Sequence, residues 1–174
     1  RLGRNSGLSA NSSPTGDPLS LNFNSLELSQ ITRGFSEIII GRSDSQGTIY
    51  IEGDLRFQDP VMMRSPQGRI IATGDESLPT IRGVGNSSLT LEAENEIILG
   101  NLVTEGGDIS VISQSDIIQI EGIHTLPNGS NQGNILLRGS EINLVGDSHS
   151  VRGSGSLRLE SSHSGQIMTL GSEE

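Results

Sequence analysis

Apolar and polar residues alternate in short runs along most of the chain, and one run keeps returning. In the segment GNILLRG, Ile135 and Leu137 alternate with polar or outward positions, and Gly139 follows them. Alternation with a period of two is typical of a β-strand that buries one face. A second pair, Ile142 and Leu144, comes a few residues later. The segment therefore predicts a strand, a tight corner and a second strand.

The same pattern, small–x–apolar–x–apolar–x–small, recurs in order along the chain with spacings of 19 to 26 residues. Aligned at its start, it gives two apolar columns and one small column. The first apolar column is Ile49, Ile70, Leu89, Ile109, Ile135 and Leu157, and the second is Ile51, Ala72, Leu91, Val111, Leu137 and Leu159. The small column is Gly53, Gly74, Ala93, Ser113, Gly139 and Ser161.

A repeat of this length with strand patterning favours a β-solenoid. The predicted fold is all-β, a parallel β-helix of about six coils stacked roughly 4.8 Å apart, so that equivalent side chains form ladders. Small corner residues allow the chain to turn inward between strands. A leucine-rich repeat is the other solenoid of this period, but the chain lacks its LxxLxLxxN signature and a helical segment in each repeat.

The segment before the first repeat predicts a short helix at about 25–33. Asn24 or Ser25 is its candidate N-cap, and Gly34 is its candidate end. The apolar run 35–40 that follows predicts an incomplete coil, and we expect the helix to fold over its exposed end as a cap, because solenoid ends need protection. The chain is thus divided into a polar arm or linker at 1–20, a capping segment at 21–46 and β-helix coils at 47–174.

At the other end the repeat fades through GQIMTLGSEE, where Ile167 and Leu170 form a degraded second pair. No capping element is predicted there, so we expect an open last coil. Further coils of a longer chain would cover it, or another copy would do so, with the arm 1–20 available for strand addition.

Composition and charge narrow the function classes. The chain has no Cys, which excludes disulfides and thiolate metal sites, and only one Tyr and three Phe. Its net charge is -10, with all positive charge on Arg, which argues against nucleic acid and anionic membranes as partners. No apolar run approaches the roughly 18 residues of a membrane span, so membrane insertion is not expected.

Three segments carry a family resemblance: LNFNSLELSQITRGFSEIIIGR, GTIYIEGDLRFQDPVMMRSPQGRI and GNILLRGSEINL. They resemble filamentous-haemagglutinin-like β-helix regions of very large secreted surface proteins of cyanobacteria and related bacteria. The likeness covers about residues 19–160. It implies a right-handed parallel β-helix displayed outside the cell. The NPNG-like motif of the family's secretion domain is approached only by LPNG, residues 126–129.

An outward column after the predicted corner supplies the first candidate site. It reads Asp54, Asp75, Glu94, Gln114, Ser140 and Ser162. Carboxylates on three successive coils would repel each other unless a cation bridged them, and calcium accepts such oxygens. Asp54, Asp75 and Glu94 are therefore a candidate calcium site; the alternative is a solvated acidic face. No other cofactor is predicted.

Two histidines form a second candidate. His124 and His149 have similar offsets in successive coils, so we expect them to approach each other in neighbouring loops. Two imidazoles can bind a transition metal, but no third ligand shares their register, which favours ordinary loop histidines. A serine hydrolase is not indicated, because no GxSxG elbow precedes a helix.

These observations favour a non-catalytic, extracellular structural module of a surface protein, sheath or matrix filament. Its expected partners are copies of itself, further coils of a longer chain, or surface glycans. In the sharper version, the open last coil of one subunit meets the N-terminal region of the next. The alternative is a polysaccharide-active or glycan-binding β-helix that uses the acidic face, with calcium.

Overall fold

The computed structural model describes residues 21, 23 and 25–169. The chain forms two units, Arg1–Ile31 and Thr32–Glu174. The arm at 1–20 and the candidate cap Asn24 lie outside the described residues. So does Leu170.

In the first unit, helix α1 spans Ser25–Ser29. The predicted helix is confirmed, but it ends before residue 33. Backbone bonds from Gln30 N to Glu27 O and from Ile31 N to Leu28 O, both 3.1 Å, close it with a tighter turn. Its role as a cap stays a prediction. No helix in the described part of the chain is long and apolar enough to cross a membrane.

The second unit is built from strands. They are β1 (Ile38–Ile40), β2 (Thr48–Ile51), β3 (Leu55–Phe57), β4 (Val61–Ser65), β5 (Arg69–Ala72), β6 (Ile81–Gly83), β7 (Leu89–Ala93), β8 (Ile97–Glu105), β9 (Ile109–Ser113), β10 (Ile117–Leu126), β11 (Ile135–Gly139), β12 (Glu141–Leu144), β13 (Val151–Arg152) and β14 (Leu157–Ser161).

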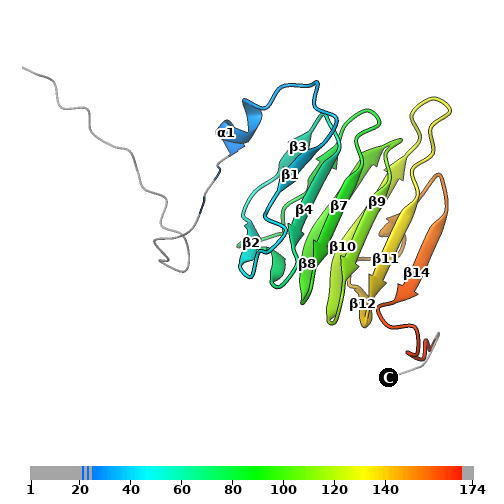
Figure 1. Ribbon diagram of the computed structural model, residues 1–174. Coiled ribbons are helices and arrows are strands. Elements are labelled where there is room, and N and C mark those ends of the chain that lie inside the picture. Colours follow the sequence, from blue (N-terminus) through cyan, green and yellow to red (C-terminus); the bar gives the residue numbers. More distant parts are fainter. Residues whose placement is uncertain (1–20, 22, 24, 170–174) are drawn as a thin grey trace, which may run out of the picture. The chain divides into compact units, whose positions relative to one another are not determined.

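These strands form two parallel sheets. One has six strands in the order β1-β4-β7-β9-β11-β14, and the other has eight, with β12-β10-β8-β5-β2 as its main path and β3, β6 and β13 beside it (Figure 1). Successive members of the first sheet belong to successive coils, as the figure shows. The predicted all-β solenoid of about six coils is therefore confirmed.

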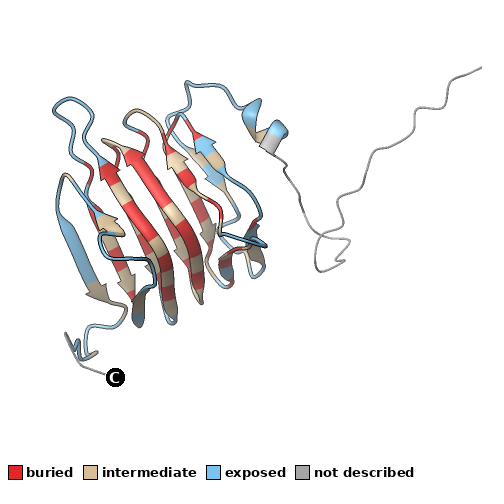
Figure 2. Cartoon of the chain, turned by 180° about the vertical axis from the view of Figure 1, so that it is seen from behind, coloured by how far each residue is buried: buried red, intermediate tan, exposed pale blue. Residues whose placement is uncertain are grey.

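The interior consists of aliphatic ladders. In the six-stranded sheet, the parallel register aligns Val61, Leu89, Ile109 and Ile135 in one ladder and Met63, Leu91, Val111 and Leu137 in the next. All eight are buried, and most of the buried surface lies in the middle strands (Figure 2). In the middle coils, the packing of like residues removes apolar surface from water on both sides of the coil.

The predicted columns were wrong for the first two repeats. Ile49 pairs with Ile70, and Ile70 pairs with Ile97, all in the eight-stranded sheet. Leu89 instead follows Val61 in the six-stranded sheet. Strands of both sheets show the same alternation of apolar and polar residues, so the sequence pattern alone does not tell which sheet a strand joins. The predicted columns therefore combined strands of two different sheets. The apolar run 35–40, predicted as an incomplete coil within the capping segment, does contain a strand, β1, which pairs with β4.

The small column is confirmed from β7 onward. Ala93 pairs with Ser113, and Gly139 pairs with Ser161. Gly53 and Gly74 belong to the other side of the coil. A serine at such a corner also forms a hydrogen bond: the buried Ser113 donates from Oγ to Asn95 O at 2.7 Å. A corner carbonyl thereby gains a hydrogen bond without a bulky side chain.

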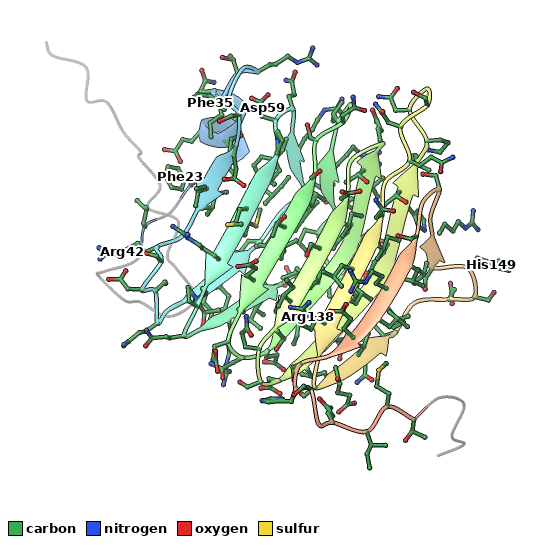
Figure 3. The ribbon with its side chains drawn as sticks, turned by 45° about the vertical axis from the view of Figure 1, so that its right-hand side comes forward. Phe23, Phe35, Arg42, Asp59, Arg138 and His149 are labelled. Carbon is green, nitrogen blue, oxygen red and sulfur yellow. The ribbon has the colours of Figure 1, made fainter. Side chains whose placement is uncertain are left out.

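An acidic residue fixes the entry into the first coil. The buried Asp59 accepts hydrogen bonds from Gly34 N at 2.8 Å and Phe35 N at 3.1 Å (Figure 3). Gly34 has a φ of 131°, a conformation that favours glycine. The chain thus turns at Gly34 and is anchored before it reaches β1.

At the opposite end of the stack, the ladder residues are exposed. Leu157 and Leu159 retain 49% and 38% of their accessible surface, against 2% and 0% for their partners Ile135 and Leu137. Figure 2 shows β14 mostly as exposed beside the buried strands. The last described coil therefore presents an apolar edge.

Candidate functional site

The predicted calcium residues do not share one column. Asp54 follows β2 and Asp75 follows β5, both in the eight-stranded sheet, whereas Glu94 follows β7 in the six-stranded sheet. Since Leu55 pairs with Ile81, the segment 73–80 also separates Asp75 from the position beside Asp54. Asp54 Oδ1 accepts a hydrogen bond from Thr80 N at 2.7 Å instead. The alignment behind the calcium hypothesis was wrong for the same reason as the columns above.

No cluster of three or more His, Asp or Glu side chains arranged to hold a metal occurs among the residues described. A metal ion is therefore not part of the functional argument below.

A different column has a distinctive chemistry. It runs along the outer face of β3, β6, the later parts of β8 and β10, and β13. There the register aligns Arg56, Arg82, Val103, His124 and Arg152. We call these five residues the basic column. Their neighbours Ile81, Leu102 and Ile123 are fully buried, so alternation turns the column outward. Arg56 and Arg152 are exposed, Arg82 and His124 are half-buried, and Val103 is covered.

The basic column gathers positive charge on an acidic chain. It holds three of the 11 arginines of a protein with net charge -10. Arg82 Nη1 lies 4.0 Å from Glu105 Oε1, a loose ion pair. Arg152 Nε donates to the backbone O of His149 at 3.0 Å. Arg56 has no ion-pair partner within the described ranges. Arg82 and Arg152 are therefore held by these contacts, and the exposed Arg56 and Arg152 remain accessible to an anion.

A hollow of about 480 Å³ adjoins this column. Its lining is Asn101, Glu121, His124, Val145, Gly146, Asp147, Ser148, His149 and Ser150. We call it the loop hollow, because residues 145–150 form the loop between β12 and β13. The floor comes from β8 and β10, and His124 belongs to both the hollow and the basic column. His124 and His149 thus line one hollow, although only His149 lies in a loop and His124 lies on β10.

The loop is tied closely to the coil before it. Val145 N donates to Ile120 O at 3.0 Å, and Ile123 N donates to Ser150 O at 2.8 Å, at its two ends. A Cβ on Gly146 would collide with Glu121 O, so only glycine permits this approach. His149 has a φ of 74°, which is rare for a residue with a side chain. Figure 3 shows it at the outer side of the stack.

The loop hollow is chemically polar. It combines two carboxylates, two imidazoles, one amide and two hydroxyls with a single aliphatic side chain, Val145. Such groups accept and donate hydrogen bonds in several directions, which suits a ligand rich in hydroxyls rather than an apolar one. Sequence reasoning missed the basic column because unequal coil lengths separate its members. Only the register brings them together.

Comparison with protein-family models, curated proteins and solved structures gives no match for this chain. The functional argument therefore depends on its own residues.

Proposed function

We propose that the protein is a non-catalytic structural module, a β-solenoid that forms part of an extracellular surface protein, sheath or matrix filament. The observation that carries the proposal is the open apolar edge of the last described coil. Leu157 and Leu159 continue ladders that are fully buried one coil earlier. An edge of this kind is a template for another strand.

The occupant that fits this edge has aliphatic residues two positions apart on a parallel strand. Further coils of a longer chain would supply such residues. Another copy would also do so, because Ile38 and Ile40 of β1 have this spacing and lie in the first coil of the same sheet. Head-to-tail contact would then extend the stack by the packing that builds each coil.

The extracellular location is supported by the sequence resemblance to haemagglutinin-like surface proteins. The parallel ladders suit a rigid spacer, because each coil stabilises its neighbours along the whole length.

Electron microscopy of the protein at increasing concentration tests the proposal. We expect rods longer than one molecule, and we expect Leu157→Glu with Leu159→Glu to abolish them, because two charges would be buried in the joint. Leu126→Glu with Leu136→Glu, which adds the same charge away from the edge strand β14, is the matched control. Rods that persist in the variant of Leu157 and Leu159 would contradict head-to-tail contact through this edge.

A second candidate function, glycan binding, is favoured by the basic column and the loop hollow. Glycan cleavage by the unmodified protein would argue for an enzyme and against the structural role.

A further inference from the structure

We propose that the basic column and the loop hollow together bind an acidic polysaccharide, with its chain lying along the axis of the stack. This inference rests on the second candidate function, glycan binding, and names its ligand class. The site is separate from the open edge, so its failure would leave the structural role untouched.

The first argument is the linear arrangement of charge. Neighbouring coils lie about 4.8 Å apart, so the four steps from Arg56 to Arg152 cover roughly 19 Å. Acidic polysaccharides carry carboxylate or sulfate groups at regular intervals along an extended chain. A guanidinium group binds either anion through two parallel hydrogen bonds, so arginines along one line, here with Val103 and His124 between Arg82 and Arg152, suit such a polymer.

The second argument is the composition of the hollow at one end of this row. Glu121 and Asp147 accept hydrogen bonds from sugar hydroxyls, while the Asn101 amide both donates and accepts. A site for a bare anion would not place two carboxylates beside His124. The combination of arginines with carboxylates and an amide matches a ligand that carries both acidic groups and hydroxyls.

The third argument separates polysaccharide from nucleic acid. Duplex DNA carries one negative charge per roughly 1.7 Å, and proteins that bind it present a correspondingly dense basic surface. Here three arginines are spread over five coils of a chain with net charge -10. Single-stranded nucleic acid needs aromatic platforms for its bases, but Tyr50 lies on β2, outside the column. A polymer with fewer charges and many hydroxyls is the better fit.

The experiment compares two variants with equal changes in charge. One replaces the column arginines, as Arg56→Gln, Arg82→Gln and Arg152→Gln. The other replaces three arginines outside it, as Arg42→Gln, Arg69→Gln and Arg158→Gln, each of which has an ion pair with a nearby carboxylate. Isothermal titration uses polygalacturonate, dextran sulfate, neutral dextran and a single-stranded DNA oligonucleotide. Thermal melting establishes that every variant is folded.

We expect the unmodified protein to bind at least one of the two acidic polymers, with affinity that falls as salt rises, and to ignore neutral dextran. The column variant should bind at least about tenfold more weakly, and the control variant within about twofold. Equal losses in both variants would overturn the proposal. So would no binding of either acidic polymer, or tighter binding of DNA than of both.

A further pair of substitutions tests the hollow separately. Glu121→Ala with Asp147→Ala removes negative charge, so attraction based on charge alone would rise. We expect the affinity for polygalacturonate to fall, because acceptors for sugar hydroxyls are lost. An increase for both acidic polymers would remove the hollow from the site.

Discussion

Every inward side chain in the middle coils contacts its equivalent in the coil before and the coil after. Leu137, for example, pairs in register with Val111 on one side and Leu159 on the other. The loss of folding stability on substitution thus depends on which way the side chain faces. An inward side chain loses contacts with two coils, whereas an outward one loses few contacts.

Replacement of Leu137 by Ala should lower the free energy of unfolding by about 2–5 kcal/mol, since this fully buried side chain would leave a cavity between coils. Urea denaturation measures the effect. The neighbouring outward Leu136→Ala is the control and should change stability by about 0.5 kcal/mol or less. Similar losses at both positions would mean that the assigned strand faces are incorrect.

Close approach of successive coils imposes a second residue-level requirement, at the turns before β9 and β11. A Cβ at Gly133 would collide with the backbone O of Gly107, and a Cβ at Gly107 would collide with Ser87 O. The backbone itself is the obstacle, so no side-chain rotation relieves the contact.

Gly133→Ala should therefore destabilise the protein by at least about 1–3 kcal/mol, the usual range for overpacking. Gly165→Ala is its control, because a Cβ there meets nothing within 4 Å. Thermal and chemical denaturation compare the two. A neutral effect at Gly133 would show that the coils separate more readily than the ladders imply.

At the scale of elements, charges join the last two strands of the six-stranded sheet. Arg138 Nε of β11 donates to Glu160 Oε2 of β14 at 2.7 Å, and Arg158 also pairs with Glu160. The hydrogen bond from Arg138, with the positive charges of both arginines, lowers the pKa of Glu160 below its ordinary value of 4.5. The carboxylate therefore contributes stability above that value and loses it as pH falls through the lowered pKa.

In measurements of melting temperature against pH, the unmodified protein should exceed Glu160→Gln near neutral pH. This difference in melting temperature should disappear as pH falls below about 4.5 and Glu160 becomes protonated. Glu52→Gln, at an exposed position with no ion pair within the described residues, should produce little difference at any pH. A difference for Glu160→Gln that is constant with pH would contradict the ion-pair contribution.

Element by element, the sequence was informative about strands and less so about their side of the coil. Alternation at Ile135 and Leu137 predicted an inward face correctly, since burial follows a period of two. Alternation at Ile49 and Ile70 is equally clear, but it belongs to the opposite sheet. A strand's own residues determine its two faces, while its partner depends on the lengths of the turns around it.

The candidate site depended more on those turns. The extra residues at 73–80 place Ile81 beside Leu55, and this offset separates the predicted acidic column while it aligns Arg56 with Arg82. His124 and His149 line one hollow, but the register pairs His124 with Arg152, because the loop after β12 is longer than the equal offsets implied. Sites that combine several coils are thus predictable only where turn lengths happen to agree.

Over the whole molecule, protection should decrease toward the open edge. Strand β9 lies between β7 and β11, whereas β14 pairs only with β11. Solenoid coils depend on their nearest neighbours, so an end coil with exposed ladder residues opens at lower free energy than a central one.

Hydrogen exchange followed by mass spectrometry should show this gradient. At a concentration where the protein is monomeric, amides of Leu157–Ser161 should exchange well before those of Ile109–Ser113. Equal protection of both segments would indicate that the last coil is covered in solution. Raising the concentration supplies the control, because end-to-end contact should slow exchange at β14 selectively.

The parallel stacking of the coils also relates position in the sequence to distance along the stack. Because each coil follows the last in the same direction, sequence position translates into axial position, as the order from Arg56 to Arg152 illustrates. A short oligosaccharide would meet one or two of these groups, and a chain that spans all coils would meet every one. If the basic column binds a polymer, it would act as a ruler, selecting ligands by how far they extend.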